Sequence, residues 1–254
     1  MPRTLVTFVA IAALVYIALC LVLFLAQRSF IYYPQARSAG DDRPTLTLSV
    51  DGERILVNTR PGPSANAVIY FGGNAENVSL SLPTLAAAFP ERSIFAMNYR
   101  GYGGSSGKPS ETGLITDALA LFDRVHVDHP QIIVIGRSLG SGVAIHIASE
   151  RPAERLVLIT PYDSLLTIAA GQLGFFPLRW LMLDKFESWS YAAKITVPTL
   201  LIAAQNDEVI PFASTKSLYD QFRPSVASLT VIRDVDHNSI SESPEYIRAV
   251  GRVP

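Results

Sequence analysis

The run "IGRSLGSG", residues 135–142, places Ser138 between Gly136 and Gly140. The apolar segment "QIIVIG" leads into it and the periodic apolar segment "VAIHIASE" leads out, so a strand is predicted to turn into a helix at Ser138. In that setting Gly-x-Ser-x-Gly is a nucleophile elbow, in which a strained backbone raises the serine hydroxyl above the sheet. The pattern predicts that Ser138 is a nucleophile and not an ordinary turn residue.

A nucleophilic serine needs a base, because its hydroxyl attacks poorly near neutral pH. His237 stands in a loop after the last strand-like segment, where an imidazole can take and return the proton. Two acids at strand ends are candidates for the carboxylate that orients it: Asp207 in "QNDEVIP" and Asp163 in "PYDS". Serine, acid and histidine then follow one another in that order along the chain.

The other three histidines have structural interpretations. His126 and His129 lie at the predicted end of a helix, in "RVHVDHP", where positive charge suits the helix dipole. His146 lies inside the helix that follows the elbow and is expected to be a packed or surface residue. His237 is therefore the histidine on which the predicted chemistry depends.

Strand-like and helix-like segments alternate through most of the chain, which predicts an α/β fold with a mostly parallel sheet. A hairpin with the turn Asp51-Gly52 comes first, over residues 45–58. The expected strands after it are 67–71, 93–99, 131–136, 155–160, 198–204 and 228–233. The expected helices are 75–88, 113–127, 141–150, about 162–192, 212–223 and about 243–250.

Five motifs in this order resemble the α/β-hydrolase superfamily, and within it the small membrane-anchored hydrolases of the Bem46 type. They are "YFGGNAEN", "NYRGYGGSSGKPSE", "GRSLGSG", "QNDEVIP" and "DHN". The resemblance covers the chain from about residue 45 to its end. It implies an α/β-hydrolase fold with helices on both faces of the sheet and a short lid. It also implies that Ser138 is the nucleophile, Asp207 the acid and His237 the base.

The same resemblance implies an oxyanion hole made by two backbone N–H groups. Leu139, directly after the nucleophile, supplies one donor. Asn74, in the loop after the strand at 67–71, supplies the other. Gly72 stands where the family has a histidine, so this loop departs from the family pattern. The neighbouring amides of Gly73 and Ala75 are therefore alternative donors.

The N-terminal segment from Leu5 to Ala26 carries no charged residue over about 22 positions, which is long enough to cross a bilayer as a helix. It exceeds the usual apolar core of a cleaved signal peptide and lacks a good cleavage site, so a retained signal anchor is predicted. The protein is therefore expected to be a single-pass membrane protein. Arg3 precedes the span, and Arg28, Arg37 and Arg43 follow it. This small excess of positive charge leans towards a cytoplasmic C-terminal side, and the topology stays open.

The expected organisation has three parts: an anchor at 1–29, a juxtamembrane linker at 30–44 and a hydrolase domain at 45–254. In the linker, Phe30, Tyr32 and Tyr33 are expected at the level of the lipid headgroups. A short lid is expected at about 162–192. Its apolar residues have two interpretations, a packed surface helix pair or a lid that lines an acyl pocket or touches the bilayer. These residues are Phe175, Phe176, Trp180, Leu181 and Met182.

Composition excludes several other classes of protein. The net charge is −1 and there is no basic stripe with interleaved aromatic residues, so nucleic acid is not an expected partner. Cys20 is the single cysteine, which leaves no intramolecular disulfide and no Cys–His metal spacing. The glycine-rich run "RGYGGSSG" lacks the lysine and the spacing of phosphate-binding loops. Neither a metal nor an organic cofactor is implied.

Together these observations predict a serine hydrolase that cleaves a small acyl ester, thioester or lipid-like substrate through an acyl-enzyme intermediate. Two alternatives stay open: a serine peptidase on the same fold, and a non-catalytic, membrane-tethered scaffold. No residues in the chain indicate a charged specificity pocket, which ranks the peptidase lower. The acyl chain length and the oligomeric state do not follow from the sequence.

Overall fold

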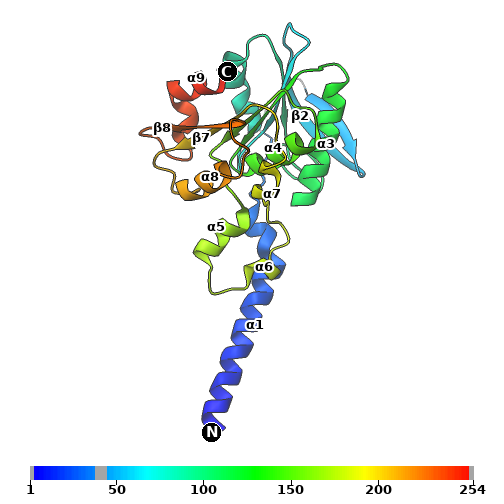
Figure 1. The fold of residues 1–254 in the computed structure, drawn as a ribbon. Coiled ribbons are helices and arrows are strands. Elements are labelled where there is room, and N and C mark those ends of the chain that lie inside the picture. The colour runs from blue at the N-terminus through cyan, green and yellow to red at the C-terminus, as the bar shows by residue number, and fades with distance from the viewer. Residues whose placement is uncertain (1–2, 38–44, 252–254) are drawn as a thin grey trace.

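One sheet of eight strands forms the centre of the protein (Figure 1). The computed structural model describes residues 3–37 and 45–251, and there the strands lie in the order β1-β2-β4-β3-β5-β6-β7-β8. Their bounds are β1 Thr45–Val50, β2 Glu53–Arg60, β3 Ala67–Phe71, β4 Ser93–Met97, β5 Ile132–Arg137, β6 Arg155–Ile159, β7 Thr199–Ala204 and β8 Ala227–Ile232. The strands expected from the sequence are thus confirmed, with ends that differ by one or two residues.

The sheet is parallel from β4 through β3, β5, β6 and β7 to β8, and antiparallel where β1 meets β2 and β2 meets β4. All residues of β3 and β6 are buried, because helices cover both faces of a parallel sheet. The hairpin turn has positive φ at Asp51 (51°) and Gly52 (80°), as a type I′ turn requires. Asp and Gly tolerate this conformation better than most residues, which sets the register of β1 against β2.

Helices pack on both faces of the sheet and complete two hydrophobic cores. One face carries α3 Glu111–His126, α4 Leu139–Glu150 and α8 Phe212–Tyr219; the other carries η1 Val78–Ser81, α2 Leu82–Ala88 and α9 Pro244–Gly251. A short turn, η2 Ser239–Glu242, precedes α9. Burying a side chain as large as Phe122, which is fully inaccessible, stabilises the fold by about 1.5–3 kcal/mol.

Helix α1, Arg3–Ile31, projects away from the sheet (Figure 1). Among the described residues it is the one helix whose length and composition would allow it to cross a membrane. Tyr32, which follows it, is buried and donates its hydroxyl to Asp184. Phe30 and Tyr33 are more than half exposed. Residues 38–44 of the expected linker lie outside the described residues.

The segment expected to be helical at about 162–192 is broken into three short helices: α5 Leu165–Gln172, α6 Leu178–Leu181 and α7 Trp189–Ala192. Ser164 begins α5 as its N-cap and accepts a hydrogen bond from the Thr167 N–H. Gly174 and Pro177 separate α5 from α6, because proline lacks the N–H that would continue the helix. We call residues 165–183 the α5–α6 hairpin; Figure 1 shows it beside α1.

Candidate active site

The turn from β5 into α4 has the strained geometry that the elbow pattern predicts. Ser138 has φ 49° and ψ −118°, a conformation rare for a residue with a side chain. A Cβ on Gly136 would lie 2.3 Å from the carbonyl oxygen of Gly140, and one on Gly140 would lie 2.1 Å from that of Phe71. Both glycines are therefore required for the strand and helix to cross this closely.

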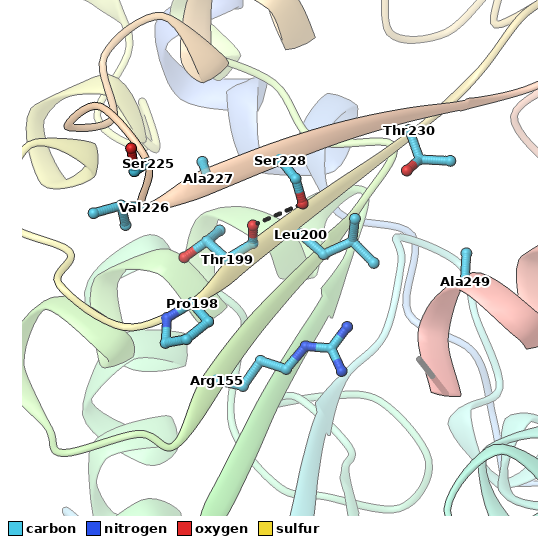
Figure 2. A pocket seen from close by; sticks show the side chains of 10 residues that line it. All are labelled: Arg155, Pro198, Thr199, Leu200, Ser225, Val226, Ala227, Ser228, Thr230 and Ala249. Atoms are coloured by element: carbon cyan, nitrogen blue, oxygen red, sulfur yellow. Dashed lines mark hydrogen bonds between the residues drawn. The ribbon is translucent and has the colours of Figure 1, made fainter. Parts of the chain in front are cut away.

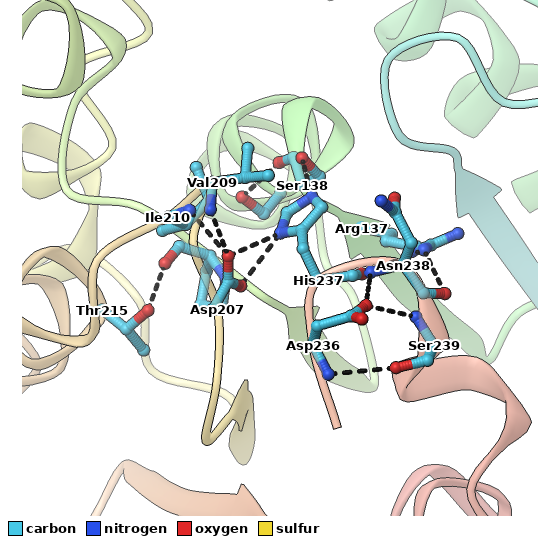
Figure 3. A network of polar contacts seen from close by, with 12 residues as sticks. Arg137, Ser138, Asp207, Val209, Ile210, Thr215, Asp236, His237, Asn238 and Ser239 are labelled. Atoms are coloured by element: carbon cyan, nitrogen blue, oxygen red, sulfur yellow. Dashed lines mark hydrogen bonds and ion pairs between the residues drawn. The ribbon is translucent and has the colours of Figure 1, made fainter. Parts of the chain in front are cut away.

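The hydroxyl of Ser138 lies within hydrogen-bond distance of His237, and His237 in turn contacts Asp207 (Figure 3). The distances are 3.0 Å from Ser138 Oγ to His237 Nε2, and 3.1 and 2.9 Å from Nδ1 to the two oxygens of Asp207. An ionised carboxylate only accepts, so Nδ1 carries the proton and Nε2 is left to accept the serine hydroxyl. The structure thus brings together the three residues named from the sequence.

Asp207 is itself held in place by backbone donors. Its Oδ1 accepts from the N–H groups of Val209 (2.9 Å) and Ile210 (2.7 Å), which turn back towards the end of β7. The side chains of Asp207 and His237 are 5% and 9% exposed, so their contact is largely shielded from water. Shielding strengthens the electrostatic coupling between carboxylate and imidazole.

The alternative acid, Asp163, has other partners. Its Oδ1 accepts from the hydroxyl of Ser214 (2.6 Å) and from the N–H of Ser164 (2.8 Å), beside the base of the hairpin. These bonds tie the chain after β6 to α8 and involve no histidine. Asp163 is therefore placed as a structural residue of that corner.

The remaining histidines lie away from Ser138. His129 Nδ1 is 3.0 Å from the carbonyl oxygen of Ala65, and the ring of His126 stacks on that of Phe122. His146 contacts Glu150 one turn further along α4, at 2.8 Å. Each has a local structural partner, as expected.

The loop after β3 lies directly beside the nucleophile. A Cβ on Gly73 would be 3.6 Å from the Cβ of Ser138. Of the three amides considered as oxyanion donors, that of Gly73 donates to Glu76 Oε2 (2.6 Å) and that of Ala75 to Asn74 Oδ1 (3.1 Å). Asn74 is left with no hydrogen-bond partner for its N–H among residues 3–37 and 45–251. Leu139 begins α4, where helix N–H groups have no partner within the helix.

The side chain of Asn74 connects this loop to the end of α1. Its Nδ2 donates to the carbonyl of Ile31 (2.6 Å), and its Oδ1 accepts from the Tyr33 N–H (3.0 Å) and the Tyr102 hydroxyl (2.8 Å). These three bonds leave the side chain no freedom to rotate. Asn74 thus has a structural role in its side chain as well as a predicted one in its backbone.

Sequence reasoning missed an ion pair that lies beneath the site, between Glu76 and Arg137. Glu76 Oε2 is 3.4 Å from Arg137 Nη1, and both side chains are mostly buried (11% and 15% exposed). Glu76 Oε1 also accepts from the hydroxyls of Tyr70 (2.8 Å) and Ser81 (2.6 Å). Burial and the nearby carboxylate raise the pKa of Tyr70 well above its ordinary value, so it remains a donor.

Arg137 extends this network to the histidine loop. Its Nη2 donates to the backbone carbonyls of His237 (3.2 Å) and Asn238 (3.3 Å), part of the network in Figure 3. Burial is the largest single influence and lowers the pKa of Arg137, but Glu76 together with Tyr70 and Tyr246 outweighs it, so the pKa is raised. Glu76 and Arg137 therefore join the loop after β3, the elbow and the histidine loop. One feature of the sequence could have indicated this ion pair. Glu76 and Arg137 are charged residues within the glycine-containing motifs "YFGGNAEN" and "GRSLGSG", where most neighbours are apolar or small.

Gly72 is explained by the same network. A Cβ there would lie 2.5 Å from Val78 Cγ1 and 3.3 Å from Glu76 Oε2. Any side chain at this position would therefore crowd Val78 and the carboxylate of Glu76. The departure from the family pattern thus leaves room for Glu76.

Among residues 3–37 and 45–251, no group of three His, Cys, Asp or Glu side chains could hold a metal ion. The arrangement places a hydroxyl within hydrogen-bond distance of an imidazole, a carboxylate behind the imidazole, and the loop after β3 close beside Ser138.

Comparison with known proteins agrees with this architecture. A family model described as the alpha/beta hydrolase fold matches residues 66–185. The protein Rv2307c of Mycobacterium tuberculosis is 34% identical over 228 residues, which cover 83% of this chain and 80% of that protein. YfhR of Escherichia coli is 30% identical over 231 residues, with 82% and 79% covered.

Solved structures show the same fold at low sequence identity. The esterase Pf2001 of Pyrococcus furiosus superposes with a TM-score of 0.69 and 20% identity, over 86% of this chain and 97% of that one. Est1E of Butyrivibrio proteoclasticus, solved with ferulic acid bound, gives a TM-score of 0.66 and 19% identity, over 81% and 96%.

Proposed function

Because this chain belongs to the α/β-hydrolase superfamily, we propose that it is a membrane-anchored serine hydrolase that cleaves carboxylic ester or thioester bonds. The expected α/β-hydrolase fold is confirmed. The finer resemblance, to the Bem46 type, remains a prediction. The observation that carries the proposal is the continuous chain of contacts from Ser138 through His237 to Asp207. The esterases among the solved structures of this fold are consistent with it.

In the proposed first half-reaction, Ser138 Oγ attacks the substrate carbonyl while its proton passes to His237 Nε2. Asp207 keeps the imidazole in the required tautomer and stabilises the imidazolium that forms. The tetrahedral intermediate collapses when His237 returns the proton to the leaving alcohol or thiol. In the second half-reaction a water attacks the acyl-Ser138 ester through the same base, which releases the acid and restores the serine.

Negative charge develops on the carbonyl oxygen during both half-reactions. The amides of Leu139 and Asn74 are the proposed donors to that oxygen. Removing one such donor in other serine hydrolases costs about 10²–10³-fold in turnover. The loop after β3 lies close against Ser138 and is held by Glu76, which supports this role because donors on such a loop would need no rearrangement when substrate binds.

The proposed organisation keeps residues 1–29 as an anchor, 30–44 as a linker and 45–254 as the hydrolase domain, with the lid at 162–192. Support for the anchor is the exposed apolar surface of α1 and its length of 29 residues, against the roughly 20 that a span requires. The bonds between Asn74 and Ile31 connect the end of this helix directly to the loop after β3. The active site would then lie close to the membrane surface, which favours lipid-like acyl substrates.

The test uses the full chain in detergent, a fluorophosphonate that labels activated serines, and acyl esters and thioesters of increasing chain length. We expect labelling and turnover in the wild-type protein and neither in Ser138→Ala. The chain-length optimum would then give the size of the acyl site. Folded protein that neither takes the label nor cleaves any ester or thioester would contradict the proposal and favour a non-catalytic scaffold. Cleavage of peptides alone would favour the peptidase.

A further inference from the structure

The α5–α6 hairpin exposes large apolar side chains around its turn. Phe175 is 93% exposed and Trp180 is 82% exposed, and Leu173 and Leu183 are also exposed. Single exposed apolar residues are common, but a group of large ones on one element indicates an interaction surface. The hairpin therefore needs a partner that the packed domain does not supply.

The hairpin lies along α1, and the contacts between them show how far it extends (Figure 1). Near the domain, Gln27 Nε2 donates to the carbonyl of Leu181 (3.1 Å) and Gln27 Oε1 accepts from the Leu183 N–H (2.7 Å). Further out, the hydroxyl of Tyr16 donates to the carbonyl of Phe175 (2.9 Å), and its ring stacks on Phe176. The turn of the hairpin thus reaches as far along α1 as the ring of Tyr16.

Tyr16 lies in the middle of the apolar segment of α1, between Leu5 and Ala26. It precedes Gln27 by eleven residues, which is about 16 Å along a helix. The hydrocarbon core of a bilayer is about 30 Å thick. If α1 crosses a membrane, the turn of the hairpin lies inside the hydrocarbon and not at its surface.

The hydrogen bonds from α1 to the hairpin supply part of what such a position demands. A turn in hydrocarbon has no water to bond its free N–H and C=O groups, so other protein groups must do so. Tyr16 bonds the carbonyl of Phe175, and Gln27 bonds the carbonyl of Leu181 and the amide of Leu183. These two polar side chains of α1 therefore supply partners for three backbone groups of the hairpin.

A polar boundary follows at the end of the hairpin that is nearest the domain. Arg28 Nε contacts Asp184 Oδ2 at 3.0 Å, with Arg28 about half exposed, and Tyr32 donates its hydroxyl to the same carboxylate. Charged pairs of this kind suit the headgroup region, since a charge costs several kcal/mol in the hydrocarbon. The one charged residue of the hairpin, Arg179, is exposed in α6 two residues before Leu181, and a long arginine side chain can extend to this same headgroup level while its stem stays among lipid chains. Asp184 thus separates the hydrolase domain from a hairpin surface that is apolar except for Arg179 and the uncharged polar residues of α5.

We propose that the α5–α6 hairpin is a re-entrant element that inserts into the bilayer beside α1, with Phe175 and Trp180 packed against lipid acyl chains. This inference rests on the proposed role of α1 as a membrane anchor. The bilayer then holds the protein at two places, the span and the hairpin. The base of the hairpin adjoins the elbow, because Phe186 packs against Gly142 of α4. The chain after the hairpin therefore leads, through Phe186, to the helix that follows Ser138.

The two tryptophans of the chain allow a direct test by fluorescence quenching. The full-length protein is reconstituted in phosphatidylcholine vesicles whose acyl chains carry bromine at different depths. Trp189→Phe leaves Trp180 on the hairpin as the single reporter, and Trp180→Phe leaves Trp189, at the start of α7, as the matched control. Two further reporters, Phe175→Trp and Leu14→Trp, are placed separately in a chain that carries both Phe substitutions.

We expect bromine to quench Trp180 several-fold more than Trp189. Phe175→Trp should be quenched best by bromines deeper in the acyl chains than those that act on Trp180. The inference would be overturned, with the anchor left intact, by the following result: Leu14→Trp is strongly quenched, but Trp180 and Phe175→Trp are quenched no more than Trp189. No quenching of Leu14→Trp would overturn both. A thermal unfolding transition for each variant checks that the reporters belong to folded protein.

Discussion

The two ends of the strands β6, β7 and β8 differ in what they contain. At the amino ends lies a hollow of about 410 Å³, lined by Arg155, Thr199, Ser228, Thr230 and neighbouring residues (Figure 2). At the carboxyl ends, the hollow beside His237 is of similar volume, about 370 Å³. Volume alone therefore does not distinguish the two ends.

Chemistry does distinguish them. The hydroxyls at the amino end have no imidazole beside them in the lining of that hollow, and Ser228 Oγ donates to the Thr199 carbonyl at 3.4 Å. At the carboxyl end a serine, an imidazole and a carboxylate are in contact, on loops that the parallel sheet brings to one edge. A serine becomes a nucleophile through its neighbours, and of these two ends it is at the carboxyl end that the described residues place an imidazole and a carboxylate beside a serine.

Removal of the nucleophile should have the largest effect. Ser138→Ala is expected to lower turnover about 10⁶-fold, because no other group can form the acyl-enzyme. Steady-state rates on the best ester measure it. Adding His237→Ala to this variant should cost little more, since the two residues act as a unit. Independent, multiplicative losses would show that they do not.

The two candidate acids provide a matched pair. Asp207→Asn should lower turnover about 10⁴-fold, because an amide at this position favours the wrong imidazole tautomer. Asp163→Asn should leave turnover per folded molecule within about tenfold while it lowers stability by about 1–3 kcal/mol through its bond to Ser214. Rates normalised to folded protein check both. The reverse ranking would make Asp163 the acid.

The Glu76–Arg137 pair should have an intermediate effect. Glu76→Gln is expected to lower kcat about 10–100-fold with little change in KM, because the loop after β3 and the histidine loop lose their shared anchor. The unpaired Arg137 should also cost about 3–5 kcal/mol of stability, part of which Arg137→Met restores in the double variant. A double-mutant cycle measures this coupling. Additive losses of stability would mean that the two side chains act separately.

A smaller, pH-dependent effect is expected at Glu111, which accepts from the amides of Lys185 (2.6 Å) and Phe186 (3.0 Å) at the base of the hairpin. Burial raises the pKa of Glu111 above its ordinary value, even though these amides favour the charged form. The folded state then binds its proton more tightly than the unfolded state, so its contribution to stability falls as pH rises through the folded pKa.

Urea unfolding at pH 4.5 and pH 7 checks this for wild type and Glu111→Gln. The stability of wild type relative to the variant should be lower at pH 7. An increase from pH 4.5 to pH 7 would show that the amides, and not burial, dominate the pKa of Glu111.

The smallest effect is expected at the amino end of the strands. Ser228→Ala removes a long hydrogen bond from an exposed side chain, so turnover should stay within twofold and stability within about 0.5 kcal/mol. The same ester assay and urea unfolding measure both. A tenfold loss of turnover would mean that the hollow in Figure 2 takes part in the reaction, and the contrast between the two ends would fail.

The sequence predicted the features that depend on residues close together in the chain. Apolar segments predicted the strands to within two residues, and Gly-x-Ser-x-Gly predicted a strained backbone at Ser138, which has a positive φ in the structure. The prediction for the segment at 162–192 was wrong in detail. The segment was expected to be helical, but it forms short helices, and Gly174 and Pro177 lie between the first two.

Tertiary structure decided what depends on side chains that are distant in the chain. Only packing shows that His237 contacts Asp207 and not Asp163, that Glu76 and Arg137 join three loops, and that Tyr16 of α1 bonds the turn of the hairpin. A sequence indicates which residues stand at strand ends. Which of them meet depends on the order and twist of the strands and on the side chains that fill the space between them, and these arise when the whole chain packs.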